Sequence, residues 1–300
     1  MKTIGVALGA GGARGLAHII ALQAFEELGV KPSVIAGTSI GAVIGAALAS
    51  GLSTAEMKDA VEEIRASKPG RFGFFSNNAE FKFAIALLDP TTEAGGLIKG
   101  EKFIRFLRNK IKAERFEDLR IPLLVIATDY WRREQVILNK GNLLKAVWAS
   151  YSLPGLFAPM MIGKDLLVDG GLMNPLPYDV LQPLCDITVA IDVSVKEITR
   201  KSRVHAQEVL FSAYQILQNS VVREKRRQSQ PDILIETEIR DVRALEFSKA
   251  QSIFEQALPA KEQLKRKLDA LLNSAEGHRP GGASIKKKIP WLWRKQSSIE

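Results

Sequence analysis

Short runs rich in apolar residues alternate along the chain with stretches whose apolar residues follow a helical spacing. The runs typical of buried strands are 4–8, 34–36, 123–127, 135–138, 165–168, 187–191 and 233–235. Helical spacing and helix-start signals predict helices over 13–28, 42–49, 53–66, 101–112, 142–149 and 245–272, the last interrupted near Pro259. A further helix has Leu210, Tyr214, Leu217 and Val221 on one face. This alternation predicts an α/β fold with a mostly parallel central sheet flanked by helices in three layers.

Two regions depart from this alternation of predicted strands and helices. Residues 67–100 concentrate aromatic side chains between Phe72 and Phe83, which fits either a lid or acyl-chain wall or an ordinary piece of core. From residue 273 the composition turns to Gly, Pro, Ser and Lys, which is typical of a mobile basic tail. We therefore expect one domain over 1–272 and a tail over 273–300.

Charge and cysteine content bear on the partners and the compartment to be expected. The 300 residues carry 42 Lys and Arg against 33 Asp and Glu, a formal net charge of +9, which favours anionic partners. The single cysteine, Cys185, excludes an intrachain disulfide and indicates a reducing compartment. The sequence has no apolar stretch long enough to cross a membrane and no convincing signal peptide. We expect a cytoplasmic protein, with peripheral contact at the inner membrane surface.

The segment Gly37-Thr38-Ser39-Ile40-Gly41 joins a predicted strand to a predicted helix. In this context a G-x-S-x-G pentapeptide is typical of a nucleophile elbow, a tight turn that lifts the serine hydroxyl out of the sheet. The flanking Gly37 and Gly41 suit a turn too tight for Cβ atoms beside the serine. Ser39 is therefore the candidate nucleophile. Taken alone it could equally be an N-cap serine.

A serine nucleophile needs a base. None of the three histidines, His18, His205 and His278, follows a strand end, where a catalytic triad of this architecture would place its histidine. Asp169 does end an apolar strand, and Gly170 and Gly171 follow it. A carboxylate held against a serine hydroxyl in a dry site can accept its proton. Asp169 is the better candidate base, although an aspartate there could also simply hold a turn.

A second glycine-rich turn, Gly9 to Gly15, lies between the first predicted strand and helix. Gly11 and Gly12 would expose successive backbone N–H groups as a nest for a developing oxyanion, and Arg14 could fix the loop. The alternative, a dinucleotide-binding loop, would need glycine where Arg14 stands and an acidic residue about 20 positions further on.

Together these motifs resemble the patatin-like phospholipase family. The matching residues are Gly9, Gly11, Gly12, Arg14, Gly15, Gly37, Ser39, Gly41, Asp169, Gly170 and Gly171, with the run 152–159 also similar to bacterial members. The resemblance covers about residues 4–195. It implies a lipid acyl hydrolase of phospholipase A or lysophospholipase type with a Ser39–Asp169 dyad, no metal and no cofactor. It also implies an oxyanion hole at Gly11, Gly12, Ala13 and Arg14.

Two other function classes remain open. A regulatory or scaffold protein could keep the elbow and act through partners, and the basic charge would suit a nucleic-acid binder, although no nucleic-acid motif is present and none is expected as a partner. The tail mixes Lys286, Lys287 and Lys288 with Trp291 and Trp293. Such a composition suits an anionic bilayer surface, the alternative being a solvated tail.

Overall fold

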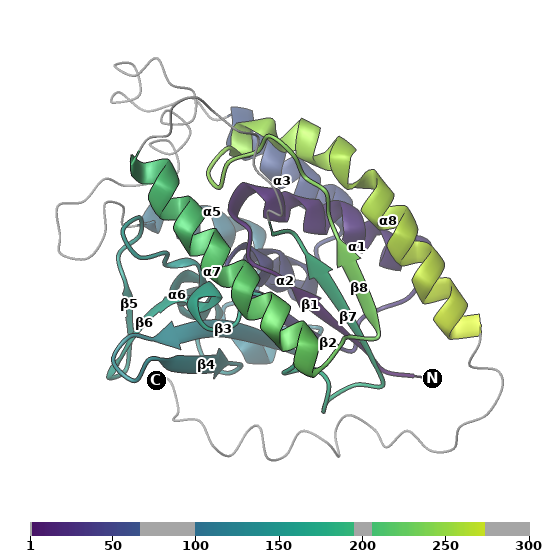
Figure 1. Cartoon of the computed structure of the whole chain (residues 1–300), viewed down its shortest axis with the longest axis horizontal. Helices are drawn as coiled ribbons and strands as arrows, with labels where there is room; N and C mark the ends of the chain where they lie inside the picture. Colours follow the sequence, from purple (N-terminus) through teal and green to yellow (C-terminus); the bar gives the residue numbers. More distant parts are fainter. Residues whose placement is uncertain (1, 67–99, 195–205, 274–300) are drawn as a thin grey trace.

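The computed structural model describes residues 2–66, 100–194 and 206–273 of the chain. Within them, eight strands form one sheet in the order β5-β6-β3-β2-β1-β7-β8, with β4 paired to β3 outside this path (Figure 1). The strands are β1 (Ile4–Leu8), β2 (Val34–Thr38), β3 (Leu123–Asp129), β4 (Glu134–Leu138), β5 (Met160–Ile162), β6 (Asp165–Asp169), β7 (Ile187–Asp192) and β8 (Ile233–Glu236). Seven of these strands were predicted from the sequence, and the three-residue β5 was not.

The middle of the sheet is parallel, as the sequence predicts. β8, β7, β1, β2 and β3 all run in one direction, and the residues of β1, β2, β3 and β7 are buried throughout. Burial on both faces explains why these strands read as continuous apolar runs. The pairs β3–β4, β3–β6 and β5–β6 are antiparallel, so the sheet is mixed at one side.

The order of pairing around β3 brings two distant strand ends together. β4 pairs with Val125–Asp129, so it overlaps the pairing of both β2, at 123–126, and β6, at 127–129. Since a strand has only two edges, β2 and β6 must share the edge opposite β4. Thr38, the last residue of β2, faces Ile126, and Asp169, the last residue of β6, faces the next residue, Ala127. The two strands therefore meet end to end.

Helices cover both faces. They are α1 (Ala17–Glu27), α2 (Ile40–Ser50), α3 (Thr54–Ala66), α5 (Glu101–Lys110), α6 (Leu143–Tyr151), α7 (Ala206–Gln228) and α8 (Ala250–Asn273), with short 3-10 turns η1 (Gly12–Leu16), η3 (Phe116–Asp118), η4 (Gly170–Leu172) and η5 (Phe247–Lys249). Together with the sheet they give the three-layer α/β/α arrangement expected. Among these helices none is long and apolar enough to span a bilayer.

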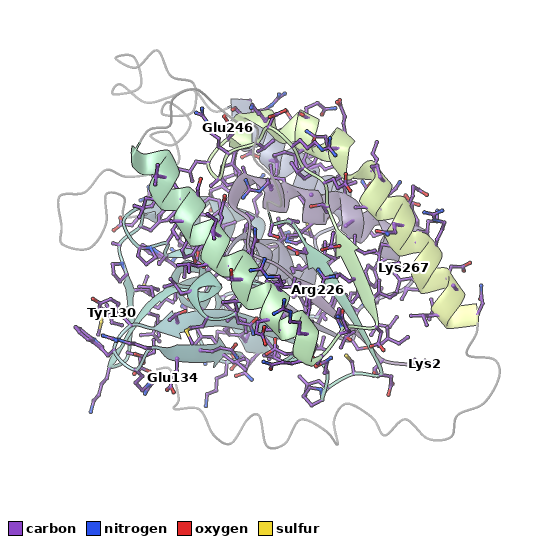
Figure 2. All side chains as sticks on the ribbon, in the orientation of Figure 1. Lys2, Tyr130, Glu134, Arg226, Glu246 and Lys267 are labelled. Carbon is purple, nitrogen blue, oxygen red and sulfur yellow. The ribbon has the colours of Figure 1, made fainter. Side chains whose placement is uncertain are left out.

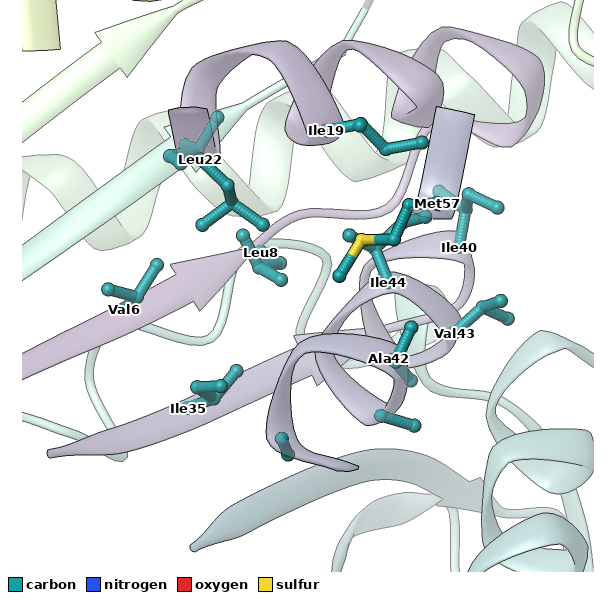
Figure 3. Close-up of a cluster of buried hydrophobic side chains, with 14 of the residues drawn as sticks. Val6, Leu8, Ile19, Leu22, Ile35, Ile40, Ala42, Val43, Ile44 and Met57 are labelled. Carbon is teal, nitrogen blue, oxygen red and sulfur yellow. The ribbon is translucent and has the colours of Figure 1, made fainter. Parts of the chain in front are cut away.

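The larger core lies on one face of the sheet. There the side chains of Val6, Leu8 and Ile35 pack against apolar residues of α1, α2 and α3, among them Leu22 and Ile44 (Figure 3). A smaller cluster on the other face joins Ala7, Ala36 and Leu124 to the segment 176–185 and to α7. The strands β1, β2, β3 and β7 are thus covered on both faces, and their ends are the parts available for chemistry.

Local signals set several helix ends. Ser53 and Glu56 form the predicted capping box at the start of α3, in which the Ser53 N–H donates to Glu56 Oε2 at 2.8 Å and the Glu56 N–H donates to Ser53 Oγ at 3.2 Å. Asn142 accepts from the Lys145 N–H at 2.9 Å and caps α6, as predicted. Both predictions are confirmed.

Three helix predictions are corrected. The helix expected from residue 13 begins at Ala17, because Gly12 takes a positive φ of 58° and the chain first forms η1. α8 runs through Pro259 without interruption. Pro259 and Glu255, whose carbonyl loses its N–H partner, are both exposed, so water can satisfy that carbonyl.

The third correction concerns the face of α7. Leu210 and Leu217, predicted on its buried side, are 63% and 65% exposed, whereas Gln218 and Val222 are buried. The reason is that the inward face of α7 also meets polar groups: Tyr214 bonds Asp169 at the end of β6, and Lys225 bonds Asp179 in the segment that follows. Farther along α7, Arg226 (labelled in Figure 2) pairs with Glu236 of β8 at 2.8 Å and fixes the helix to the sheet edge.

Candidate functional site

Ser39 stands at the sharp turn between β2 and α2. Its φ of 57° and ψ of −122° are strained for a residue with a side chain, which is typical of a nucleophile elbow. The Ser39 N–H donates to Ser150 Oγ at 2.9 Å, and the Ser150 hydroxyl donates to the Ile126 carbonyl at 2.6 Å. A Cβ on Gly41 would collide with the Leu8 carbonyl. The turn is therefore held from β1, β3 and α6 together.

Ser39 and Asp169 meet where β2 and β6 end against β3. The Ser39 hydroxyl donates to Asp169 Oδ2 at 2.8 Å, although 130 residues separate the two. A Cβ on Gly170 would collide with the Ile126 carbonyl, so glycine is needed for the chain to leave β6 so close to β3. The structure thus brings the predicted nucleophile and base within hydrogen-bond reach.

The second oxygen of Asp169 has its own partners. Oδ1 accepts from the Gly171 N–H at 2.6 Å and from the Tyr214 hydroxyl at 3.2 Å. The backbone on either side is fixed by Ser152 and Thr128: the Asp169 N–H donates to the Ser152 carbonyl at 2.9 Å, and the Thr128 hydroxyl donates to the Asp169 carbonyl at 2.9 Å. The carboxylate is consequently held in one orientation.

Burial controls the acidity of this carboxyl. Asp169 is 3% exposed. Desolvation raises the pKa of Asp169 to about 6, against the hydrogen bonds from Gly171, Ser39 and Tyr214, which favour the ionised form. A base with a pKa near 6 is ionised at neutral pH and is better matched to taking a proton than an ordinary aspartate.

The turn from Gly9 to Gly15 faces the same place. The Ala10 N–H donates to the Pro175 carbonyl at 2.8 Å and the Ala13 N–H to the Ala244 carbonyl at 2.7 Å. Between them, the N–H groups of Gly11 and Gly12 have no acceptor among the described residues. Two adjacent donors of this kind, in the cavity that Ser39 also lines, are what an oxyanion would require. The N–H of Ala13, which the resemblance includes in the oxyanion hole, is already engaged.

Arg14 anchors this turn through its buried side chain. Its guanidinium donates to the Val242 carbonyl at 2.8 Å, and the side chain is 2% exposed. Burial lowers the pKa of Arg14 to about 10, and the nearby charge of Glu246 partly offsets that effect. Arg14 thus ties the glycine turn to the segment 242–246, far away in sequence, and it is not among the residues that line the cavity around Ser39.

These groups open into one cavity of about 190 Å³. Ser39, Asp169, Gly11 and Gly12 all line it. Its other walls are mainly apolar side chains of α2, α3, α5, α6 and α7, for example Val43, Met57, Phe106, Tyr151 and Phe211. Such a lining suits a hydrocarbon chain, with the polar groups gathered at the Ser39 end.

His18 lies outside this arrangement. His18 is fully buried, its Nε2–H donates to the Gly9 carbonyl at 2.8 Å, and desolvation lowers its pKa to about 4. It is not part of the cavity wall. His205 and His278 lie outside the described residues, as do the segment from Phe72 to Phe83 and the basic tail.

Sequence reasoning missed two residues at the site. Ser150, on α6, fixes the backbone of Ser39, and Tyr214, on α7, touches Asp169. Both lie on helices whose apolar periodicity gives no sign of their long-range partners. Across residues 2–66, 100–194 and 206–273, no three His, Cys, Asp or Glu side chains gather in a way that could hold a metal ion.

Ser39 is a strained serine at a strand-to-helix turn of an α/β sheet, and a carboxylate stands at the adjoining strand end. This arrangement is typical of α/β proteins with a nucleophile elbow. The family model described as "Patatin-like phospholipase" matches residues 6–181, more than half of this chain. The chain therefore belongs to the patatin-like phospholipase family. Asp169 and both glycine motifs lie inside the matched range, and Tyr214 and the segment 242–246 lie beyond it.

Curated relatives agree with this membership. An uncharacterized NTE family protein of Mycobacterium tuberculosis is 33% identical over 195 residues, covering 65% of this chain and 50% of the relative. Patatin-like phospholipase domain-containing protein 6 of Mus musculus is 34% identical over 201 residues, covering 66% of this chain and 14% of the relative. The chain thus spans about half the length of the mycobacterial relative and a smaller part of the mouse one.

Among solved structures, VipD from Legionella pneumophila has a TM-score of 0.49 at 17% identity, covering 90% of this chain and 67% of VipD.

Proposed function

We propose that this protein hydrolyses carboxylic esters of lipids through an acyl-Ser39 intermediate, with Asp169 as the base. The observation that carries the proposal is the 2.8 Å hydrogen bond from Ser39 Oγ to Asp169 Oδ2 at the wall of an apolar cavity. Membership in the patatin-like phospholipase family supports the same reaction class. The substrate would be of phospholipid or lysophospholipid type, with its acyl chain along the apolar walls.

The reaction has two halves. Ser39 Oγ attacks the ester carbonyl carbon while its proton passes to Asp169 Oδ2, and the carbonyl oxygen becomes an oxyanion that the N–H groups of Gly11 and Gly12 stabilise. The C–O bond to the alcohol breaks, and that alcohol leaves with the proton from Asp169. Water then attacks the acyl-Ser39 carbonyl, gives its proton to Asp169, and the acid is released as Ser39 regains its proton.

The proposal extends to the organisation of the chain. The enzyme unit would be residues 1–272, because α7, the segment 242–246 and α8 all contribute to the site or its support. The tail from 273 to 300 would contact anionic membrane through Lys286, Lys287, Lys288, Trp291 and Trp293. The protein would act in the cytoplasm, peripherally at the inner membrane surface.

A lipid-panel hydrolysis assay tests the function. Wild-type protein and Ser39→Ala would be incubated with phospholipids, lysophospholipids and simple esters, and released fatty acid would be measured. The proposal requires turnover of at least one acyl ester by wild type and none by Ser39→Ala. A folded wild-type protein that hydrolyses none of them would favour a regulatory or scaffold role instead.

A further inference from the structure

The carboxylate of Asp169 receives donors from three separate elements, and one of them lies beyond the family match. Ser39 approaches Oδ2, whereas Gly171 and Tyr214 approach Oδ1. Tyr214 is on α7, 45 residues after Asp169. Its ring also lines the cavity, so the hydroxyl reaches Oδ1 from the wall of the site. No sequence motif identified above predicts this contact.

We propose that Tyr214 is a positioning residue for the candidate base: its hydroxyl, with the Gly171 N–H, holds Asp169 Oδ1 and leaves Oδ2 directed at Ser39. This inference rests on the proposed function of the same site. Without Tyr214, Oδ1 would keep one donor only, in a site from which water is largely excluded. The carboxyl could then rotate, and its ionised form would be less well stabilised.

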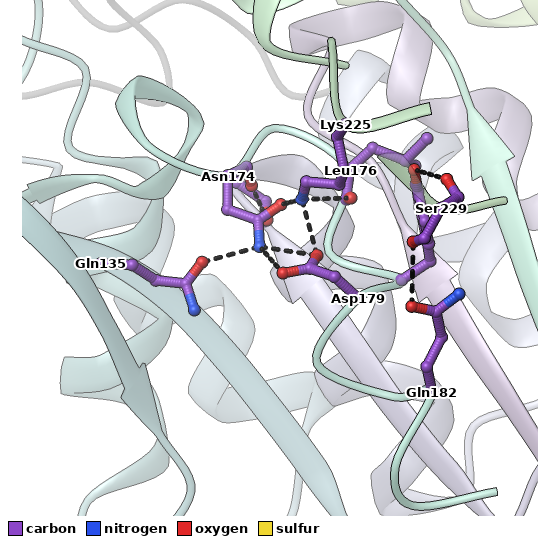
Figure 4. A network of polar contacts seen from close by, with 9 residues as sticks. Gln135, Asn174, Leu176, Asp179, Gln182, Lys225 and Ser229 are labelled. Carbon is purple, nitrogen blue, oxygen red and sulfur yellow. Dashed lines mark hydrogen bonds and ion pairs between the residues drawn. The ribbon is translucent and has the colours of Figure 1, made fainter. Parts of the chain in front are cut away.

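The position of Tyr214 is fixed from the far end of α7. Lys225, about three turns later on the same face, donates to the Asn174 side chain, to the Leu176 carbonyl at 3.2 Å and to Asp179 Oδ1 at 2.6 Å (Figure 4). Asn174 in turn accepts the Thr38 hydroxyl on its carbonyl at 2.8 Å. The helix that carries Tyr214 is thus tied to the loop after Asp169 and to the residue before Ser39.

The hydroxyl of Tyr214 is one of the three donors that favour the ionised form of Asp169, after Gly171 and Ser39. The groups that influence its ionisation are Gly171, Ser39 and Tyr214, and no charged side chain is among them. Burial and the neighbouring carboxylate raise the pKa of Tyr214 well above its ordinary value, so the hydroxyl stays protonated and keeps donating. Gln218, on the next turn of α7, hydrogen-bonds the same hydroxyl and orients it.

The test is the pH dependence of Tyr214→Phe, which keeps the ring and removes only the donor. Hydrolysis of a soluble p-nitrophenyl ester and the rate of fluorophosphonate labelling would be followed from about pH 5 to about pH 9. We expect kcat/KM at neutral pH to fall about tenfold and the acid limb to move about one unit higher, because the ionised base loses a hydrogen bond. Ile216→Ala, at a 64% exposed position of the same helix, is the matched control and should behave as wild type.

The outcomes separate the inference from the function on which it rests. If wild type neither hydrolyses esters nor reacts with the probe, the proposed function fails. If wild type is active and the Tyr214→Phe profile superimposes on it, the positioning role is wrong. Should Tyr214→Phe melt far below wild type, Gln218→Leu keeps the ring and loosens the hydroxyl; it should move the acid limb in the same direction by less, and an unmoved limb would overturn the inference.

Discussion

The hydroxyl of Ser39 lies 2.8 Å from Oδ2 of Asp169 because β2 and β6 end against consecutive residues of β3. Each strand places its last residue at the junction, and the following glycine-containing turn leads the chain away. The nucleophile and its candidate base are therefore positioned by sheet register, and loops contribute little to their spacing. This explains how two residues so distant in sequence can be held without a histidine between them.

The first prediction separates activity from stability at Asp169. Asp169→Asn should lose about a thousandfold in turnover, because an amide cannot take the proton. Its stability should rise relative to wild type above about pH 6. Burial gives the folded carboxyl a pKa of about 6, while the unfolded one ionises near pH 4, so ionisation costs wild type on the order of 3 kcal/mol as pH rises through that window.

Thermal melting of both proteins at about pH 4 and about pH 8 measures this effect. The stability advantage of Asp169→Asn should be present at the higher pH and absent at the lower one. An advantage of equal size at both would mean that the ionisation of Asp169 does not cost folding free energy.

A second prediction concerns the buried histidine. His18→Gln should retain turnover within about tenfold of wild type, because the glutamine amide can still donate to the Gly9 carbonyl. Ester hydrolysis per folded molecule, with melting as the fold check, compares it with Asp169→Asn. Equal loss of activity in the two variants, both folded, would restore histidine as a candidate base.

The glycine turn gives a third prediction with a matched control. Gly12 and Gly155 both have positive φ, so alanine at either costs about 1 kcal/mol of strain. Only at Gly12 would the Cβ also collide, with the Ala244 carbonyl, whereas Gly155 faces open space. Gly12→Ala should therefore lower kcat at least about tenfold through displaced oxyanion donors. Steady-state kinetics measure kcat for both variants. An equal decrease in Gly12→Ala and Gly155→Ala would mean that the glycine turn takes no part in catalysis.

The fourth prediction concerns the basic tail. Removal of residues 279–300 should leave turnover of a soluble ester unchanged, since Ser39, Asp169 and the glycine turn all lie far earlier in the chain. Binding to anionic vesicles should weaken, and the full-length protein should lose binding as salt rises, because screening shortens the reach of charges to about 8 Å at physiological ionic strength. Vesicle co-sedimentation at low and high salt measures the binding of each form and its salt dependence. Equal binding by the full-length and truncated proteins would mean that the tail does not contribute to membrane binding.

Much of the sheet and both glycine motifs could be predicted from the sequence because their signals are local. A buried parallel strand such as 123–127 reads as an apolar run, and the elbow at Ser39 is a pentapeptide in its proper context. The three-residue β5 is too short for any periodicity to show. The meeting of β2 with β6 depends on which edge of β3 each strand occupies, and no local pattern encodes that choice.

The inward face of α7 also could not be predicted from the sequence pattern. The helical spacing of Leu210, Tyr214 and Leu217 predicted a conventional apolar face, yet the two leucines are exposed and Tyr214 points to Asp169. The inward stripe carries polar residues because it covers a polar site. Tyr214, Gln218 and Lys225 acquire their partners only through tertiary contacts, which the sequence pattern alone does not contain.

The most direct test of the central claim is the reaction of the folded protein with a fluorophosphonate probe, followed by peptide mass spectrometry. We expect one covalent adduct, on Ser39, formed rapidly by wild type, formed much more slowly by Asp169→Asn and absent from Ser39→Ala. An unlabelled wild-type protein, or an adduct on another serine such as Ser152 with Ser39 unmodified, would contradict the claim.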